Sequence, residues 1–154
     1  MKPSNSQAQK DVELEILKTL GLQLNCDFKH DESIRSSHWN ASPTVDGIDY
    51  NNKVICEIIS RVGSTSASRD KKIMSDAMKL LLIDSLLEGG FKKIIVVVDP
   101  VFARKFSPEA GSWQALALSK NGIELKIIPL SDQSRLKIVR AQERQSAGIV
   151  KKLA

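Results

Sequence analysis

Two acidic residues are spaced so that they could hold a divalent cation. Asp46 begins an extended segment, and Glu57 interrupts the apolar run that follows it, with ten residues between the two acids. Asn51 and Asn52 predict a hairpin turn between them, because asparagine tolerates positive φ. Such a hairpin brings the two carboxylates side by side, which is costly inside a sheet protein unless something compensates their charge. Mg²⁺ does so, held by one or two carboxylates, waters and substrate phosphate oxygens.

The chemistry predicted for this pair is hydrolysis of a phosphodiester bond. A bound cation polarises the phosphate and lowers the pKa of an attacking water. We therefore expect Asp46 and Glu57 to be metal ligands and catalytic residues. Three alternatives stay open: the dipeptide Asp46-Gly47 is also typical of turns, Asp49 is a rival ligand, and Glu57 could form a structural ion pair with an arginine or lysine. A charge within an apolar strand is expensive, which favours a functional Glu57.

The elements that position these acids follow from hydrophobic periodicity and turn residues. They are a helix at 11–20, a strand at 22–28, a polar loop at 29–43, strands at 44–50 and 54–62, a helix at 68–87, a buried strand at 93–98, a helix at 108–120, a strand at 123–129 and a basic helix from 131. Strands joined through helices pair in parallel, whereas the hairpin is antiparallel. The pattern predicts an α/β domain with a mixed sheet and helices on both faces. We expect a flexible tail at 1–10, the α/β domain at 11–130 and a basic C-terminal helix or tail at 131–154.

The order of elements and the two acids resemble the PD-(D/E)XK superfamily of restriction-type nucleases over residues 11–130. That family places an Asp at the start of one hairpin strand, matched by Asp46. It places a Glu or Asp, a variable residue and a Lys in the next strand, and here residues 54–61 read Val-Ile-Cys-Glu-Ile-Ile-Ser-Arg. The resemblance implies a restriction-endonuclease-like fold and an endonuclease dependent on Mg²⁺ or Mn²⁺. DNA is the expected substrate because the family mostly cuts DNA.

One departure affects the catalytic group. Ile59 stands where the family has the Lys that orients the attacking water and stabilises developing charge. Lys71 and Lys72, at the start of the following helix, and Arg61, on the same strand face as Glu57, are candidates to supply the positive group. The alternative is a catalytically inactive module on the same fold that binds nucleic acid or acts as an assembly subunit.

Other polar residues have weaker patterns. Glu13 and Glu15 could add a ligand, as first-helix acids do in parts of the family, but acids near a helix start favour a solvated face. His30 and His38 fit no zinc spacing, so a flexible loop is expected there. Asp99 ends a buried strand, where it is either a functional group or the first residue of an Asp-Pro turn.

The charge of the chain favours a polyanionic partner. Its net charge is +5 and its pI about 9.3, which indicates nucleic acid first. The candidate phosphate contacts are Ser64 and Ser66 before the long helix, and Arg135, Lys137, Arg140 and Arg144 in the C-terminal helix. A solvated basic helix is an equal alternative for the second group. The aromatic content of 5% argues against a surface built for base stacking.

The remaining features predict a cytoplasmic protein without a membrane partner. Residues 1–10 are polar and show no signal peptide, and the apolar runs fall short of the roughly 18 residues that span a bilayer. Cys26 and Cys56 form no metal or redox pattern, so both are expected to be reduced. Cutting both strands of a duplex needs two sites, which favours a homodimer.

Overall fold

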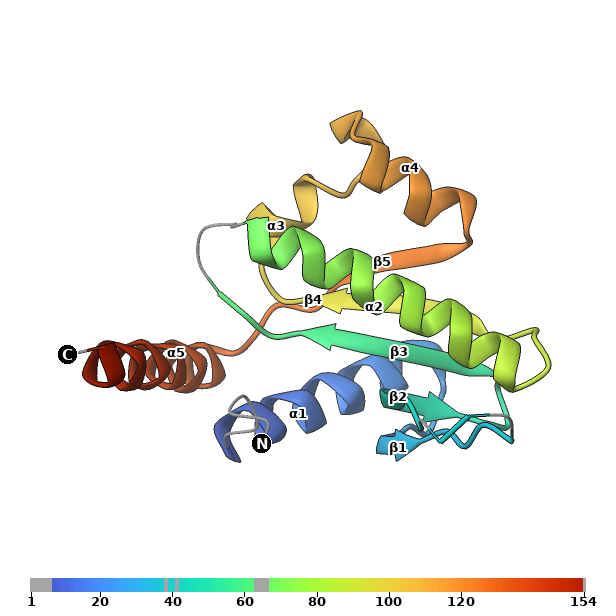
Figure 1. The fold of residues 1–154 in the computed structure, drawn as a ribbon, viewed down its shortest axis with the longest axis horizontal. Coiled ribbons are helices and arrows are strands. Elements are labelled where there is room, and N and C mark those ends of the chain that lie inside the picture. The colour runs from blue at the N-terminus through green and yellow to red at the C-terminus, as the bar shows by residue number, and fades with distance from the viewer. Residues whose placement is uncertain (1–6, 38, 41, 63–66, 154) are drawn as a thin grey trace.

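The computed structural model describes residues 7–37, 39–40, 42–62 and 67–153, with side chains left out at 67–69 and 145–153. It is an α/β fold with a mixed five-stranded sheet flanked by helices (Figure 1). The elements in chain order are α1 (Gln7–Leu24), β1 (Lys29–Ser33), β2 (Thr44–Asp49), β3 (Val54–Ile59), α2 (Ala67–Leu86), β4 (Lys92–Val97), α3 (Pro100–Arg104), the 3-10 helix η1 (Pro108–Ala110), α4 (Trp113–Lys120), β5 (Ile123–Ile127) and α5 (Asp132–Leu153).

The strands lie in the sheet in the order of the chain. β1, β2 and β3 form an antiparallel meander, and β3, β4 and β5 run parallel. β2 and β3 are joined by the predicted hairpin, in which Gly47 pairs with Cys56 and Ile48 with Ile55. The residue with positive φ in this turn is Lys53, at 54°, and not one of the two asparagines.

Alternate residues of the central strands supply two cores. Ile55 and Ile59 of β3 pack with α2, α3 and α4 on one face. Cys56 and Ile58 pack with α1 and the start of α5 on the other. All six residues of β3 are buried, as the continuous apolar sequence of a strand covered on both faces predicts.

Gly47 lets α1 approach the sheet closely. A Cβ at this position would lie 2.5 Å from Leu17 Cδ2 and 2.8 Å from Cys56 Sγ. Leu17 is one helical turn from Glu13, so the packing at Gly47 also sets the distance between Glu13 and the neighbouring Asp46.

The predicted strand at 22–28 is wrong. α1 runs on to Leu24, and the first strand is β1, inside the stretch predicted to be a polar loop. The apolar residues Leu24 and Phe28 do not belong to a strand. They pack against the core under α1. β1 reads as polar because it lies at the edge of the sheet, where its residues alternate between exposed and partly buried.

Two further helical segments differ from the prediction. The helix expected at 108–120 is interrupted, because Gly111 adopts a φ of 69° and Ser112 caps α4 through the amide of Ala115. The short helix α3 was not predicted. Asp99 is its N-cap and accepts a hydrogen bond from the amide of Val101. The Asp99-Pro100 pair therefore has a structural task at the start of α3.

The C-terminal helix is attached to the domain. Ile138 is buried in the core under α1, and the Gln142 side chain accepts from the Val62 amide and donates to the Val62 carbonyl. The Ser134 hydroxyl donates to Glu15. Within the described ranges, no helix has the length and apolar character needed to cross a bilayer.

We predict that Gly47→Ala lowers the free energy of unfolding by about 1–3 kcal/mol, because the added methyl overpacks the contact with Leu17 and Cys56. Urea denaturation checks this. The second variant Leu17→Val removes one of the clashing methyl groups, so the double variant should lose less stability than the sum of the two single variants. Strictly additive losses would contradict the close contact.

Candidate active site

The candidate site centres on Asp46 and Glu57, which the hairpin brings together. The ladder between β2 and β3 ends at the Gly47–Cys56 pair, and beyond it Asp46 Oδ2 accepts a hydrogen bond of 2.8 Å from the Ile58 amide. The Asp46 carboxylate thus accepts from the Ile58 amide in place of a backbone carbonyl of β2. The Asp46 and Glu57 carboxyl groups lie close enough to share a hydrogen bond when Glu57 is protonated. Asp46 and Gly47 both lie within β2, so the turn alternative does not hold.

Glu57 is a buried carboxyl group in an electrostatically unfavourable place. Its side chain is 1% exposed. Burial, and then the charge of Asp46, raise the pKa of Glu57 to about 10, and the nearby Lys79 does not cancel this shift. Its buried Oε1 is in contact with the Lys79 ammonium, 2.7 Å away. The direction of the shift favours the protonated form of Glu57 at neutral pH.

The basic group at this site is Lys79, from the middle of α2. Its Nζ lies 2.7 Å from Glu57 Oε1, which is an ion-pair contact. Burial alone would lower the pKa of Lys79, but Glu57, Asp76 and Asp46 together raise it above its ordinary value.

Asp76 extends the group along α2. It is buried, at 5% exposed, and burial raises its pKa although Lys72 and Lys79 oppose the shift. Lys72 Nζ lies 3.2 Å from Asp76 Oδ2. Lys72 thus acts on the site through Asp76, while the ion pair of Glu57 is made by Lys79.

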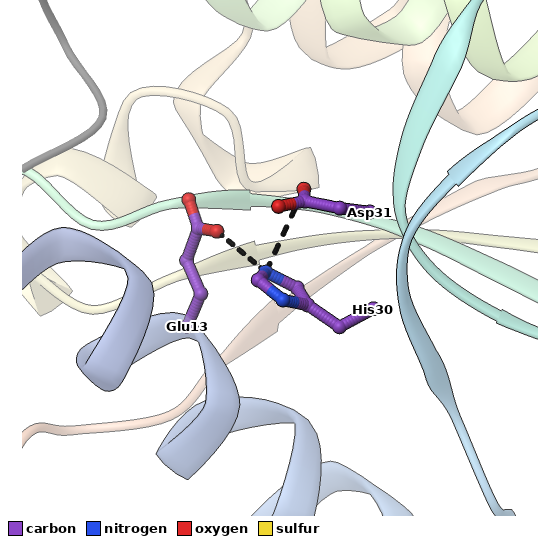
Figure 2. Close-up of side chains that lie close together, drawn as sticks. All are labelled: Glu13, His30 and Asp31. Atoms are coloured by element: carbon purple, nitrogen blue, oxygen red, sulfur yellow. Dashed lines mark hydrogen bonds and ion pairs between the residues drawn. The ribbon is translucent and has the colours of Figure 1, made fainter. Parts of the chain in front are cut away.

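Glu13 of α1 and His30 and Asp31 of β1 form a second cluster (Figure 2). His30 Nε2 lies 2.8 Å from Glu13 Oε2 and 3.6 Å from Asp31 Oδ1. One possible ligand atom from each of the three residues lies within 4.8 Å of the other two. Burial, and then the charge of Asp46, raise the pKa of Glu13, while the hydrogen bond from His30 lowers it. Asp46 therefore couples this cluster to Glu57.

The expectations for Glu13 and His30 are corrected by these contacts. Glu13 is 6% exposed and does not lie on a solvated face. His30 belongs to β1 and pairs with Gly47, so the expected flexible loop is an ordered strand at this residue. His38 lies outside the described residues.

Asp49 is occupied by a structural task. Its carboxylate accepts hydrogen bonds from the Asp27 amide and from the amide and side chain of Asn52. The Asn52 bonds are the main reason why the pKa of Asp49 is lowered to about 2. Asp49 thus closes the hairpin turn and ties it to the segment before β1, which leaves Asp46 as the acid beside Glu57.

The structure places the other candidates around this centre. Arg61 and Lys71 are exposed, and neither is the ion-pair partner of Glu57. Ser64 and Ser66 lie outside the described residues. In the part of α5 whose side chains the structure describes, the exposed basic residues are Arg135, Lys137, Arg140 and Arg144.

Sequence reasoning missed Lys79 and Asp76, although a signal was present. The apolar stripe of α2 contains Ile73, Ala77 and Leu80, and a residue three positions after Ile73 falls on the same stripe. Asp76 is therefore a charge on a buried helix face, which needs a partner. The same periodicity places Glu13 with Ile16, Leu17 and Leu20 on the buried side of α1.

We predict that Glu57→Gln flattens the pH dependence of stability. Between the ordinary pKa of 4.5 and the folded-state value of about 10, the folded protein keeps a proton that the unfolded chain releases. The free energy of unfolding therefore falls as the pH rises through this window, by up to about 1.4 kcal/mol per pH unit. Urea denaturation from about pH 5 to about pH 9 should show a steeper loss for the wild type than for Glu57→Gln. Parallel curves would contradict the raised pKa, because Glu13 and Asp76 titrate in both proteins.

No protein-family model matches the chain, and neither the curated proteins nor the solved structures include a match to it. Its function is therefore inferred from the chemistry of these side chains.

Proposed function

We propose that this chain is a nuclease dependent on a divalent metal ion, with a restriction-endonuclease-like fold and a site built on Asp46 and Glu57. The observation that carries the proposal is the meeting of two carboxyl groups inside the sheet: Glu57 is 1% exposed and lies beside Asp46, whose charge adds to burial in raising the pKa of Glu57. Two carboxyl groups so placed disfavour each other's ionisation, and a hard cation is the partner that relieves this.

The arrangement of elements supports the resemblance noted from the sequence. A helix precedes the β2–β3 hairpin, and a helix and a buried parallel strand follow it. The two acids lie on the two strands of that hairpin, as in the nuclease family. The extra pairing of β1 with β2 and of β5 with β4 is compatible with the same sheet.

The oxygen-rich surroundings fit Mg²⁺ or Mn²⁺. Asp46 and Glu57 would hold the ion, and Glu13 is the nearest further carboxylate on the α1 side. His30 and Asp31 offer an imidazole and a third carboxylate next to Glu13. Imidazole ligands are more typical of transition metals than of Mg²⁺, which favours Mn²⁺ for an ion that reaches His30. Such an ion supplies Lewis-acid polarisation of the phosphate and activates water.

Lys79 would supply the positive group that the nuclease family carries at the position of Ile59. It approaches Glu57 from α2 instead of from β3. Glu57, Asp76 and Asp46 together raise the pKa of Lys79, and its ammonium would stabilise a developing negative charge on the phosphate. Lys79 replaces Lys71, Lys72 and Arg61 as the best candidate for this role.

The surface near the site suits a polyanion. Gln142 fixes α5 to Val62, just beyond the carboxyl end of β3, and Figure 1 shows α5 extending past the ends of β3 and β4 toward which both strands point. The four exposed basic residues of α5 would contact phosphates without reading sequence. DNA remains the expected substrate on the resemblance alone.

A second function is favoured by one specific observation. Lys79 already lies 2.7 Å from Glu57 and supplies the positive charge that a cation would bring. A site neutralised in this way suits an inactive nuclease-fold module that binds nucleic acid or acts as an assembly subunit.

We predict that the protein cleaves plasmid DNA in Mn²⁺ or Mg²⁺, and that Asp46→Asn, Glu57→Gln and Lys79→Met each lower the rate at least about 100-fold, because each removes a ligand or a charge that stabilises the transition state. Gel analysis of nicked and linear plasmid measures this. Lys120→Met is the matched control, since Lys120 is exposed at the end of α4. Wild-type binding to DNA without cleavage, unchanged in Asp46→Asn and Glu57→Gln, would favour the inactive module.

We also predict that binding of one Mn²⁺ near neutral pH releases close to one proton, because the ion displaces the proton held on Glu57. Calorimetric titration in two buffers of different ionisation enthalpy measures the release. Glu57→Gln should bind Mn²⁺ more weakly and release fewer protons. A binding enthalpy that is the same in both buffers would show that the ion does not compete with this proton.

A further inference from the structure

The outer edge of β5 is an unusual sheet edge. β5 is the last strand of the sheet and pairs only with β4 among the described strands. An unpaired edge exposes backbone donors and acceptors that can pair with another strand. The opposite edge, β1, has the polar sequence Lys-His-Asp-Glu-Ser and a positive φ at Asp31, which are features that discourage such pairing. β5 instead alternates three apolar residues with one acid and one base, Glu124 and Lys126.

The sequence of β5, Ile-Glu-Leu-Lys-Ile, is complementary to itself. If two copies pair antiparallel about Leu125, Ile123 of each copy lies opposite Ile127 of the other, and Glu124 lies opposite Lys126. Period-two alternation then puts the apolar side chains on one face and both charged pairs on the other. Opposite charges placed directly across an antiparallel pair stabilise it, and like charges there destabilise it.

The surroundings of β5 are apolar and exposed. Ile127 is 44% exposed. Beside the strand lies a hollow of about 600 Å³, lined by residues that include Pro100, Phe106, Leu118, Ile123, Leu125 and Ile127. Figure 1 shows β5 and α4 at the end of the sheet farthest from β1.

Exposed large side chains continue this apolar surface. Trp113 and Leu116 of α4 are 66% and 58% exposed. Trp113 and Leu116 line a second hollow, which shares Pro108 and Ala115 with the first. Contiguous exposed apolar surface of this kind marks an interaction site in many proteins.

We propose that β5 pairs antiparallel with β5 of a second copy of this chain, joining the two sheets edge to edge. The charge complementarity of Glu124 and Lys126 selects a second copy over an unrelated strand. Glu124 also lies 3.2 Å from Lys92 of its own chain, but both side chains are about half exposed, so this contact is weak and leaves Glu124 accessible. The pairing is separate from the nuclease proposal, since Asp46 and Glu57 lie on β2 and β3.

The test is sedimentation velocity of the full chain over a concentration series. The wild type should show a reversible monomer–dimer equilibrium. Glu124→Lys and Lys126→Glu each place like charges opposite one another, so each should raise the dissociation constant at least about tenfold. An equimolar mixture of the two variants restores both opposite-charge pairs and should dimerise, as should the double variant with exchanged charges.

Circular dichroism and thermal unfolding of each variant verify that the fold is retained. A wild type that stays monomeric at its highest soluble concentration would overturn the proposal. A dimer that both single variants preserve, or a mixture that fails to associate when the wild type does, would overturn it as well. Plasmid cleavage by the β5 variants is measured separately, because the pairing of β5 and the site at Asp46 and Glu57 are independent proposals.

Discussion

The contact between the carboxyl groups of Asp46 and Glu57 is the interaction on which the rest of the site depends. Burying Glu57 beside another acid is unfavourable, and the fold compensates it in three ways. The Ile58 amide donates to Asp46, Lys79 lies against Glu57, and a proton stays on Glu57 at neutral pH. Two buried acids that need this much compensation form a place where a ligand with positive charge would be stabilised, which is the basis of the metal proposal.

The scaffold holds this pair from both faces of the sheet. On one face α2 brings Lys79 and Asp76 toward β3. On the other face α1 packs on Gly47 and brings Glu13 toward Asp46. The alternation of side chains across the sheet explains why two helices that do not touch the same core can act on one acidic centre.

Much of the fold could be predicted from the sequence, because its signals are local. The five buried aliphatic residues around Val96 predict a central strand, and the paired asparagines predict the hairpin that joins Asp46 to Glu57. β1 could not be found in this way, since an edge strand with polar residues carries neither an apolar run nor β-branched enrichment. α3 is a five-residue helix, which is too short for a periodic pattern.

The candidate site was predictable only in part. The two acids follow from spacing, but the basic group depends on which turn of α2 packs over β3, which is a tertiary contact. Lys71 and Lys72 are nearer to Glu57 in the sequence, whereas Lys79 is the lysine in contact with it in the structure. Glu13 and His30 are similar, because their contact joins residues of α1 and β1 that no short motif connects.

The most direct measurement is a crystal structure of the protein soaked with Mn²⁺, recorded with anomalous scattering. We predict an anomalous peak at coordination distance, about 2 Å, from the carboxylates of both Asp46 and Glu57, with Lys79 moved away from Glu57 Oε1. A map with no peak between the two acids, and with Lys79 still paired to Glu57, would contradict a metal-dependent site.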